Sequence, residues 1–198
     1  MTSALHTITG RELPTLAWHH MQQEDPLHLQ ERFRSPYSKG IISKPRGGLW
    51  TAVLYQGDLS AFSTWGSSPF FRMRNGPLAP FMTPLRAKEE ARFLVIDGMA
   101  DAVAARHAFA GKPHRPDFGG ISDRGLTDFT LLPRSGLAGV YLTRRGVLEC
   151  ADPDAGEADM WGWDVECVWC AVPEVEVAGV TCQWLVAGQL PTRPVDVP

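Results

Sequence analysis

The sequence predicts an α+β fold, with a split, mostly antiparallel β-sheet core and short flanking helices. Short strand patterns recur along the whole chain, while helical patterns are few and brief. A doubly wound sheet would need regular alternation of strands and helices, and the spacing lacks it. The length of 198 residues suggests one domain. We expect it to span residues 1–190, followed by a flexible tail at residues 191–198.

In the first half of the chain, residues 3–9 alternate apolar and polar side chains and include β-branched residues, which predicts a strand. Residues 11–24 carry a loose apolar stripe after a proline, which favours a helix. Residues 48–55 form a second apolar strand pattern. Asp58 is a suitable N-cap for a short helix after it. Loops rich in proline and glycine are expected at residues 25–47 and 66–84.

In the second half, residues 85–92 are charged and favour a helix, while residues 92–97 form a short buried strand. Residues 99–110 place alanines at helical spacing, which predicts a helix. Residues 139–143 follow a glycine turn and predict another strand. Residues 162–172 are apolar on both faces, which is typical of a strand covered on both sides. Two closing strands are expected at residues 175–180 and 182–186.

Glu166 interrupts the apolar run of the strand expected at residues 162–172. An ionised carboxylate in such a place is costly unless it is paired or opens onto a cleft. Glu166 is therefore a candidate working residue. The alternative is a glutamate at the exposed end of the strand, or one paired with an arginine.

Composition and charge exclude several classes of protein. A net charge of −3 provides no basic field that would steer in a polyanion. No apolar run reaches the roughly 18–20 residues that a membrane span needs, so we expect no membrane partner. The first residues do not have the pattern of a signal peptide. We expect the protein in the cytoplasm, and delivery to another cell by a route without a signal peptide stays open.

The cysteines do not form a disulfide pattern, and they are Cys150, Cys167, Cys170 and Cys182. The spacing of Cys167 and Cys170 suits zinc, but positions i and i+3 of a strand point to opposite faces. We therefore expect buried core cysteines and no metal site. A zinc site built from these cysteines is the alternative.

Three short motifs follow one another in a characteristic order. Residues 5–9 read Leu-His-Thr-Ile-Thr, residues 44–51 read Lys-Pro-Arg-Gly-Gly-Leu-Trp-Thr, and residues 163–166 read Trp-Asp-Val-Glu. The ordered set resembles the ADP-ribosyltransferase-like family, in its divergent branch with a His…Trp/Thr…Glu core, over roughly residues 4–172. Asp164 stands where many mono-ADP-ribosyltransferases carry Glu or Gln, which weakens the case for arginine side chains as acceptors.

The resemblance implies NAD as co-substrate and Glu166 as the catalytic residue, stabilising the positive charge that develops on the ribose. It implies that His6 bonds the adenosine-side ribose and that Thr51 bonds a ribose or helps to seat Glu166. Trp50, Phe62 or Trp65 would stack on the nicotinamide ring, and Arg46 or a basic residue of segment 66–92 would meet the diphosphate. The residues expected to contact NAD are His6, Thr7, Arg46, Gly48, Leu49, Trp50, Thr51, Phe62 and Trp65.

The expected function is that of an NAD-dependent ADP-ribosyltransferase or NAD glycohydrolase, of a toxin- or effector-like kind. It would cleave the nicotinamide–ribose bond and transfer ADP-ribose to a protein, a nucleic acid or a small molecule. Two alternatives remain: a non-catalytic binding or interaction protein on the same fold, and an unrelated α+β domain with a cysteine zinc site. The oligomeric state stays open.

Overall fold

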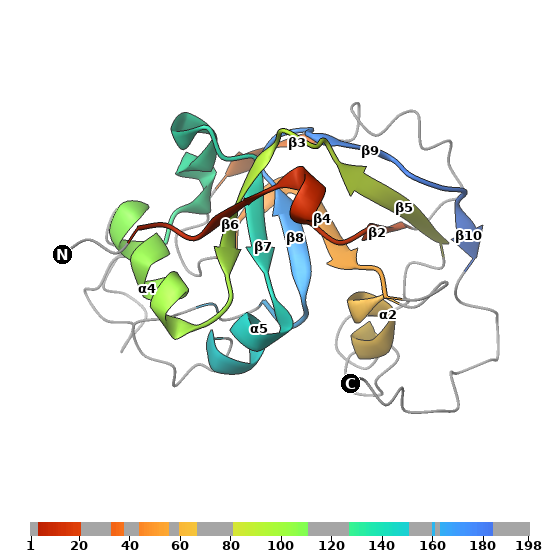
Figure 1. Ribbon diagram of the computed structural model, residues 1–198. Coiled ribbons are helices and arrows are strands. Elements are labelled where there is room, and N and C mark those ends of the chain that lie inside the picture. Colours follow the sequence, from red (N-terminus) through yellow and green to blue (C-terminus); the bar gives the residue numbers. More distant parts are fainter. Residues whose placement is uncertain are drawn as a thin grey trace.

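The structure is a computed structural model (Figure 1), and it describes residues 4–20, 33–37, 44–55, 60–66, 81–110, 127–150, 160 and 163–183, the side chains of residues 64–66 and 183 excepted. The strands are β1 (Thr7–Thr9), β2 (Leu16–His20), β3 (Arg34–Tyr37), β4 (Arg46–Val53), β5 (Phe81–Ala87), β6 (Arg92–Ile96), β7 (Gly139–Leu142), β8 (Cys167–Cys170), β9 (Val175–Val177) and β10 (Cys182–Gln183). The helices are the 3₁₀ turns η1 (Gly10–Glu12) and η3 (Phe129–Ser135) and the α-helices α2 (Ala61–Gly66), α4 (Met99–Ala108) and α5 (Arg144–Cys150).

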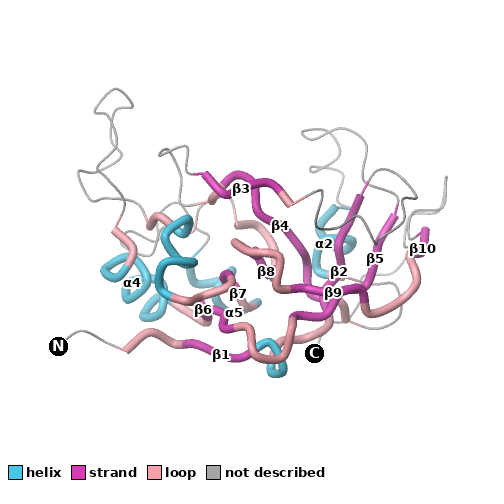
Figure 2. Tube along the Cα trace, turned by 90° about the horizontal axis from the view of Figure 1, so that it is seen from above, coloured by secondary structure: helices cyan, strands magenta, loops and turns pink. Residues whose placement is uncertain are grey.

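One sheet organises the described part of the chain, in the order β1-β6-β7-β8-β4-β2-β5-β10, with β3 paired to β4 and β9 paired to β5. Among the described strands only β6 and β7 run parallel. Seen from above, the sheet is curled rather than flat, and α4 and α5 lie at the end that holds β6 and β7 (Figure 2). The prediction of an α+β fold with a mostly antiparallel sheet and short helices is confirmed, whereas the predicted split is not, because the described strands pair in one sheet.

The pairing register separates two faces of the sheet, because directly opposite residues share a face. We call one the tryptophan face, defined by the row Leu94, Val140, Trp169 and Trp50. The other is the tyrosine face, defined by the row Val95, Tyr141, Val168 and Thr51. Each face carries its own apolar core. The tryptophan face is covered by side chains of α4 and η3, and its largest buried side chains are Trp163 and Trp169.

Several predicted elements are confirmed, two predicted helices are wrong, and β3 and the start of β5 lie where loops were predicted. The strands at residues 48–55, 92–97 and 139–143 and the helix at residues 99–110 are present as β4, β6, β7 and α4. The helix predicted at residues 11–24 is wrong, because Leu16–His20 form β2 between β4 and β5, and residues 21–24 lie outside the described part. Its Leu16 and Ala17 are fully buried there, so tertiary pairing outweighs the loose helical stripe.

The helix predicted at residues 85–92 is also wrong. β5 continues to Ala87, and a turn at residues 88–91 leads into β6. The strand predicted at residues 162–172 is shorter, since β8 covers only Cys167–Cys170. α5 was not predicted from the sequence. The hydroxyl of Thr143 caps its start by accepting a hydrogen bond from the Gly146 N–H at 3.1 Å. Within the described residues, no helix is long and apolar enough to cross a membrane.

Candidate functional site

A pocket of about 480 Å³ lies against β2, β4 and β8. Its floor includes Ala17, Ala52 and Cys167, which are paired across the three strands and therefore lie on one face. Trp50, two residues before Ala52 on β4, shares that face, so the pocket opens on the tryptophan face.

Aromatic rings form the walls of this pocket. Trp50 packs edge-on against Trp163, with ring centroids 4.8 Å apart and planes at 62°. Trp163 in turn packs edge-on against Phe129 at 5.4 Å and is only 1% exposed. Phe62, from α2, lines the pocket as well. Rings held by other rings have little freedom, so the walls are flat and pre-formed.

Two cationic residues and one acidic residue border the same pocket: Lys44, Arg46 and Asp164. The Lys44 ammonium lies over the Trp50 ring, 4.7 Å from its centroid. Burial lowers the pKa of Lys44, and the charge of Arg46 acts in the same direction, while Cys167 and Asp164 oppose the change. The pocket thus combines flat apolar walls with a mainly cationic rim.

The position of Phe62 depends on a hydrogen-bonded connection between β2 and α2. His19 Nε2 lies 2.7 Å from Ser60 Oγ, and the His19 ring lies 4.8 Å from that of Phe62. Ser60 and Ser63 cap the helix reciprocally, each accepting the other's backbone N–H, at 3.0 and 2.7 Å. Ser60 is completely buried, so its hydroxyl serves the cap and is not placed to attack a ligand.

His19 is neutral at physiological pH. Burial, with a further contribution from the neighbouring charge of His20, lowers the pKa of His19 to about 4. The imidazole therefore adds a polar but uncharged group to the pocket lining.

Glu166 lies on the tyrosine face. Its carboxylate accepts hydrogen bonds from the hydroxyls of Tyr55, at 3.0 Å, and Tyr141, at 2.7 Å. Burial, with a smaller contribution from the Glu166 charge, raises the pKa of Tyr55 to about 12. The pKa of Tyr141 is also raised, by burial and by the hydrogen bond to Glu166. The sequence allowed an arginine partner for this carboxylate, and the structure provides two phenols. The pocket is lined by the flanking residues Val165 and Cys167, and Glu166 is not part of that lining.

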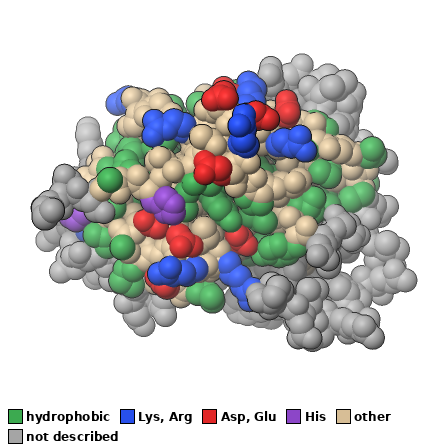
Figure 3. Space-filling view, in the orientation of Figure 1, with side chains coloured by type: hydrophobic (Ala, Val, Ile, Leu, Met, Phe, Trp, Pro, Cys, Tyr) green, Lys and Arg blue, Asp and Glu red, His purple; other side chains and the backbone are tan. Residues whose placement is uncertain are grey.

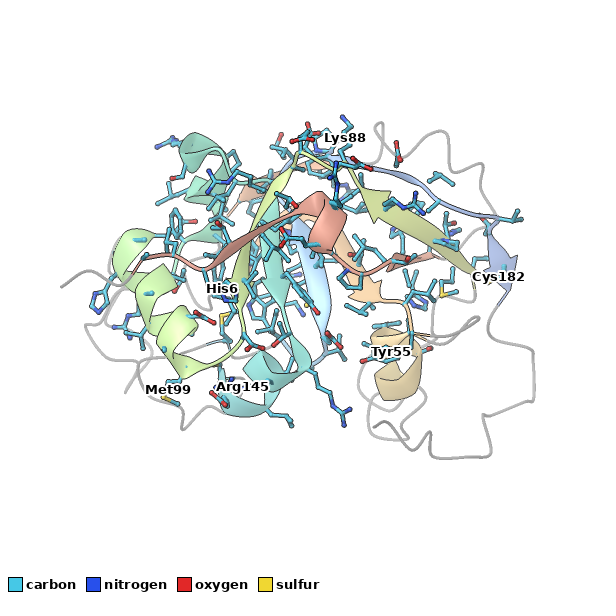
Figure 4. The ribbon with its side chains drawn as sticks, viewed as in Figure 1. His6, Tyr55, Lys88, Met99, Arg145 and Cys182 are labelled. Atoms are coloured by element: carbon cyan, nitrogen blue, oxygen red, sulfur yellow. The ribbon has the colours of Figure 1, made fainter. Side chains whose placement is uncertain are left out.

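His6 and Thr7 lie at the edge of the sheet. The backbone oxygen of His6 accepts from Val95 N–H, and its ring nitrogen Nδ1 lies 3.4 Å from Asp101. Thr7 accepts from Arg92 at 3.3 Å. Three strands, β6, β7 and β8, lie between β1 and β4, so the path along the sheet from these residues to the Trp50 strand is four strand spacings, about 19 Å. Figure 4 shows His6 well apart from Tyr55, which lies beyond the end of β4.

The other residues assigned to NAD divide between pocket and core. Arg46, Trp50, Thr51 and Phe62 line the pocket, although the Thr51 hydroxyl donates to the Val168 carbonyl at 2.8 Å. Leu49 is buried in the core of the tyrosine face. The side chain of Trp65 lies outside the part that the structure describes.

Gly48 has a packing role. Its φ of +63° suits glycine, and a Cβ there would lie 2.5 Å from the Trp169 indole nitrogen. That nitrogen donates to the Gly47 carbonyl at 3.0 Å. The absence of a side chain at Gly48 therefore lets Trp169 fill the core of the tryptophan face.

The chain matches no known protein family, no curated protein and no solved structure. The ADP-ribosyltransferase-like assignment therefore depends on the three motifs, and it stays a prediction.

The cysteines are free thiols in the described part of the chain. Burial raises the pKa of Cys167 and of Cys170 to about 12, so neither is a ready thiolate. Cys167 packs in the core of the tryptophan face and Cys170 in that of the tyrosine face, as the strand alternation predicts. Within the described residues, no group of three or more His, Cys, Asp or Glu side chains could hold a metal ion.

A network of charged side chains lies where the parallel strands β6 and β7 end. Thr143 donates to Asp97 at 2.6 Å, and Arg145 donates to Glu149 at 2.8 Å. Asp101 accepts from the Asp97 N–H at 2.9 Å. Charged side chains of both signs gather beside a histidine on the face shown in Figure 3. Arg145 also donates to Asp97 at 3.5 Å, so these bonds connect the ends of β6 and β7 to α4 and α5, which gives the network a structural role.

Sequence reasoning missed His19, Lys44, Trp163 and Asp164 as pocket residues. His19 was expected on a helix, and only its placement in β2 directs it toward the pocket. Asp164 drew attention only as a departure from a family motif. The aromatic content near residue 163 was a usable signal, because large rings close to a charged segment often border binding sites.

Proposed function

We propose that this protein binds NAD in the Trp50 pocket, cleaves the nicotinamide–ribose bond and transfers ADP-ribose to an acceptor or to water. The supporting observation is that one pocket combines flat walls, from Trp50 and Phe62, with two cationic residues, Lys44 and Arg46. Flat rings suit the bases of a dinucleotide, and paired cations suit its diphosphate. The pocket volume of about 480 Å³ is typical of small-molecule sites.

The proposed reaction breaks the bond between the ribose C1′ and the nicotinamide nitrogen. Nicotinamide leaves with the electron pair and becomes neutral, and a hydroxyl of the acceptor or of water then attacks C1′ and loses its proton. A carboxylate beside the ribose would stabilise the positive charge in the transition state by about 3–4 kcal/mol. The motif resemblance assigns the role of this carboxylate to Glu166, whereas Asp164 is the acidic residue among the described residues that line the pocket.

A second candidate is a protein that binds a nucleotide without cleaving it. It is favoured by the surroundings of Glu166, whose carboxylate accepts two phenol hydrogen bonds on the face opposite the pocket. A carboxylate engaged in this way is well satisfied as part of the structure.

Nicotinamide release from NAD, followed by chromatography, separates these candidates. We expect release by the wild type, and a loss of roughly a hundredfold or more in whichever of Asp164→Asn and Glu166→Gln removes the working carboxylate. Glu176→Gln is the matched control, because Glu176 is an exposed carboxylate on β9.

Calorimetric titration with NAD completes the test. Binding without release supports the non-catalytic candidate. If NAD neither binds nor loses nicotinamide, the proposal fails. Trp50→Leu is expected to weaken NAD binding by about tenfold, because the flat wall beside the cationic rim is lost.

A further inference from the structure

The contact between Lys44 and Trp50 bears on which part of a dinucleotide the pocket accepts. A cationic nicotinamide ring would be attracted to the electron-rich face of an indole. In this protein the Lys44 ammonium already lies over the Trp50 ring, 4.7 Å from its centroid. Trp163 packs edge-on against the same indole ring, with the two ring centroids 4.8 Å apart. A second cation at this ring would be held within a few ångströms of the ammonium and repelled by it.

The charged side chains of the described lining residues, Lys44, Arg46 and Asp164, sum to a net positive charge. Arg46 adds a second cationic residue to the lining, and Asp164 is the one acid among the described lining residues. His19 adds no charge at neutral pH, since burial lowers its pKa to about 4. The charges of the described lining residues therefore favour an anion with a neutral ring over a cationic ring.

We infer that the pocket holds the adenosine diphosphate half of the dinucleotide, with neutral adenine against the aromatic walls and the diphosphate beside Lys44 and Arg46, and that the cationic nicotinamide ring lies away from the Trp50 indole. This inference rests on the proposed function, since it concerns the orientation of the same ligand in the same pocket. It differs from the expectation drawn from the motifs, in which Trp50, Phe62 or Trp65 stacks on the nicotinamide ring.

Competition between two half-molecules tests the inference. ADP carries the neutral base and the diphosphate, whereas nicotinamide mononucleotide carries a phosphate and the cationic ring, and 1-methylnicotinamide carries the cationic ring alone. We expect ADP to bind at least about tenfold more tightly than nicotinamide mononucleotide by calorimetry, and 1-methylnicotinamide not to compete.

The variant Lys44→Met retains most of the side-chain volume and removes the charge. We expect it to weaken ADP binding by about tenfold and to strengthen binding of 1-methylnicotinamide, because the indole face becomes available to another cation. Lys44→Arg, which retains the charge, is the control and should stay within about threefold of the wild type for ADP. Near-UV circular dichroism verifies that each variant is folded, and Arg46→Met, with the same expected loss for ADP, replaces Lys44→Met should that variant not fold.

Three results would overturn the inference. One is tighter binding of nicotinamide mononucleotide than of ADP, and another is an unchanged ADP affinity in folded Lys44→Met. In both cases, NAD binding and nicotinamide release by the wild type would leave the proposed function standing. If neither NAD nor any of the half-molecules binds, the inference and the proposed function fail together.

Discussion

The two faces of the sheet around β4 and β8 differ in chemistry although alternate residues of the same strands contribute to both. The tryptophan face presents Trp50 and Trp163 to a pocket with a cationic rim. The tyrosine face presents a carboxylate, Glu166, that accepts hydrogen bonds from Tyr55 and Tyr141. Neighbours in a strand point to opposite faces, so a motif of consecutive residues cannot supply all its side chains to one site. A strand motif should therefore be divided into two sets before either is assigned a role.

The largest expected effect is a loss of stability when a buried ring of the tryptophan face is removed. Trp163→Ala removes a ring that is 1% exposed and in edge contact with Trp50 and Phe129. We expect a loss of about 3–5 kcal/mol in the free energy of unfolding, measured with urea. Tyr141→Phe, which removes one hydroxyl on the tyrosine face, should cost about 1 kcal/mol. Equal losses in the two variants would contradict the view that this face carries the aromatic core.

Acid should lower the free energy of unfolding through His19, which lies on the tryptophan face. Its pKa in the folded state, about 4, is below its ordinary value of 6.5, so the unfolded chain binds more protons as pH falls. Stability that is present above pH 6.5 is therefore lost as pH falls toward 4, by roughly 3 kcal/mol at most. We expect the free energy of unfolding to rise with pH between 5 and 6.5 in the wild type and to be flatter in His19→Gln. An equally steep profile in the variant would assign the effect to other groups.

Alkali should lower the stability of the protein through Tyr55, which donates a hydrogen bond to Glu166 on the tyrosine face. Burial and the Glu166 charge raise the pKa of Tyr55 to about 12, so its stabilising contribution is present below pH 10 and is lost as pH rises through 12. In Glu166→Gln the carboxylate charge is gone while burial remains, so the tyrosines should ionise at lower pH, followed by absorbance at 295 nm. We expect this variant to lose about 1–3 kcal/mol of stability at neutral pH. Unchanged tyrosine titration would mean that Glu166 does not interact with these phenols.

The smallest expected effect concerns Thr51, whose hydroxyl donates to the Val168 carbonyl. Thr51→Val keeps the shape and removes this bond, so we expect a loss of about 1 kcal/mol or less in stability. NAD affinity should not change, because the hydroxyl is engaged within the sheet. A tenfold loss of NAD affinity in calorimetry, at unchanged stability, would instead support the ribose contact that the motif predicts.

Local pattern was sufficient for several elements of the fold. The segments that became β6, β7 and α4 combine a clear periodicity with glycines at their borders, and they were predicted close to their bounds. The segment that became β2 was not, since Leu16, Ala17 and Trp18 fit a helix as well as a strand. Its neighbours β4 and β5, distant in sequence, determine its conformation.

The sequence by itself determined the fold class, the apolar run around Glu166 and the cluster of rings near residue 163, because composition and short-range periodicity are local properties. Only the tertiary structure decided that β1 pairs with β6 and not with β4, which keeps His6 away from Trp50. It also decided that Lys44 lies over Trp50 and that Glu166 meets two tyrosines. Strand edges carry similar donors and acceptors, so the choice of neighbour depends on burial across the whole sheet.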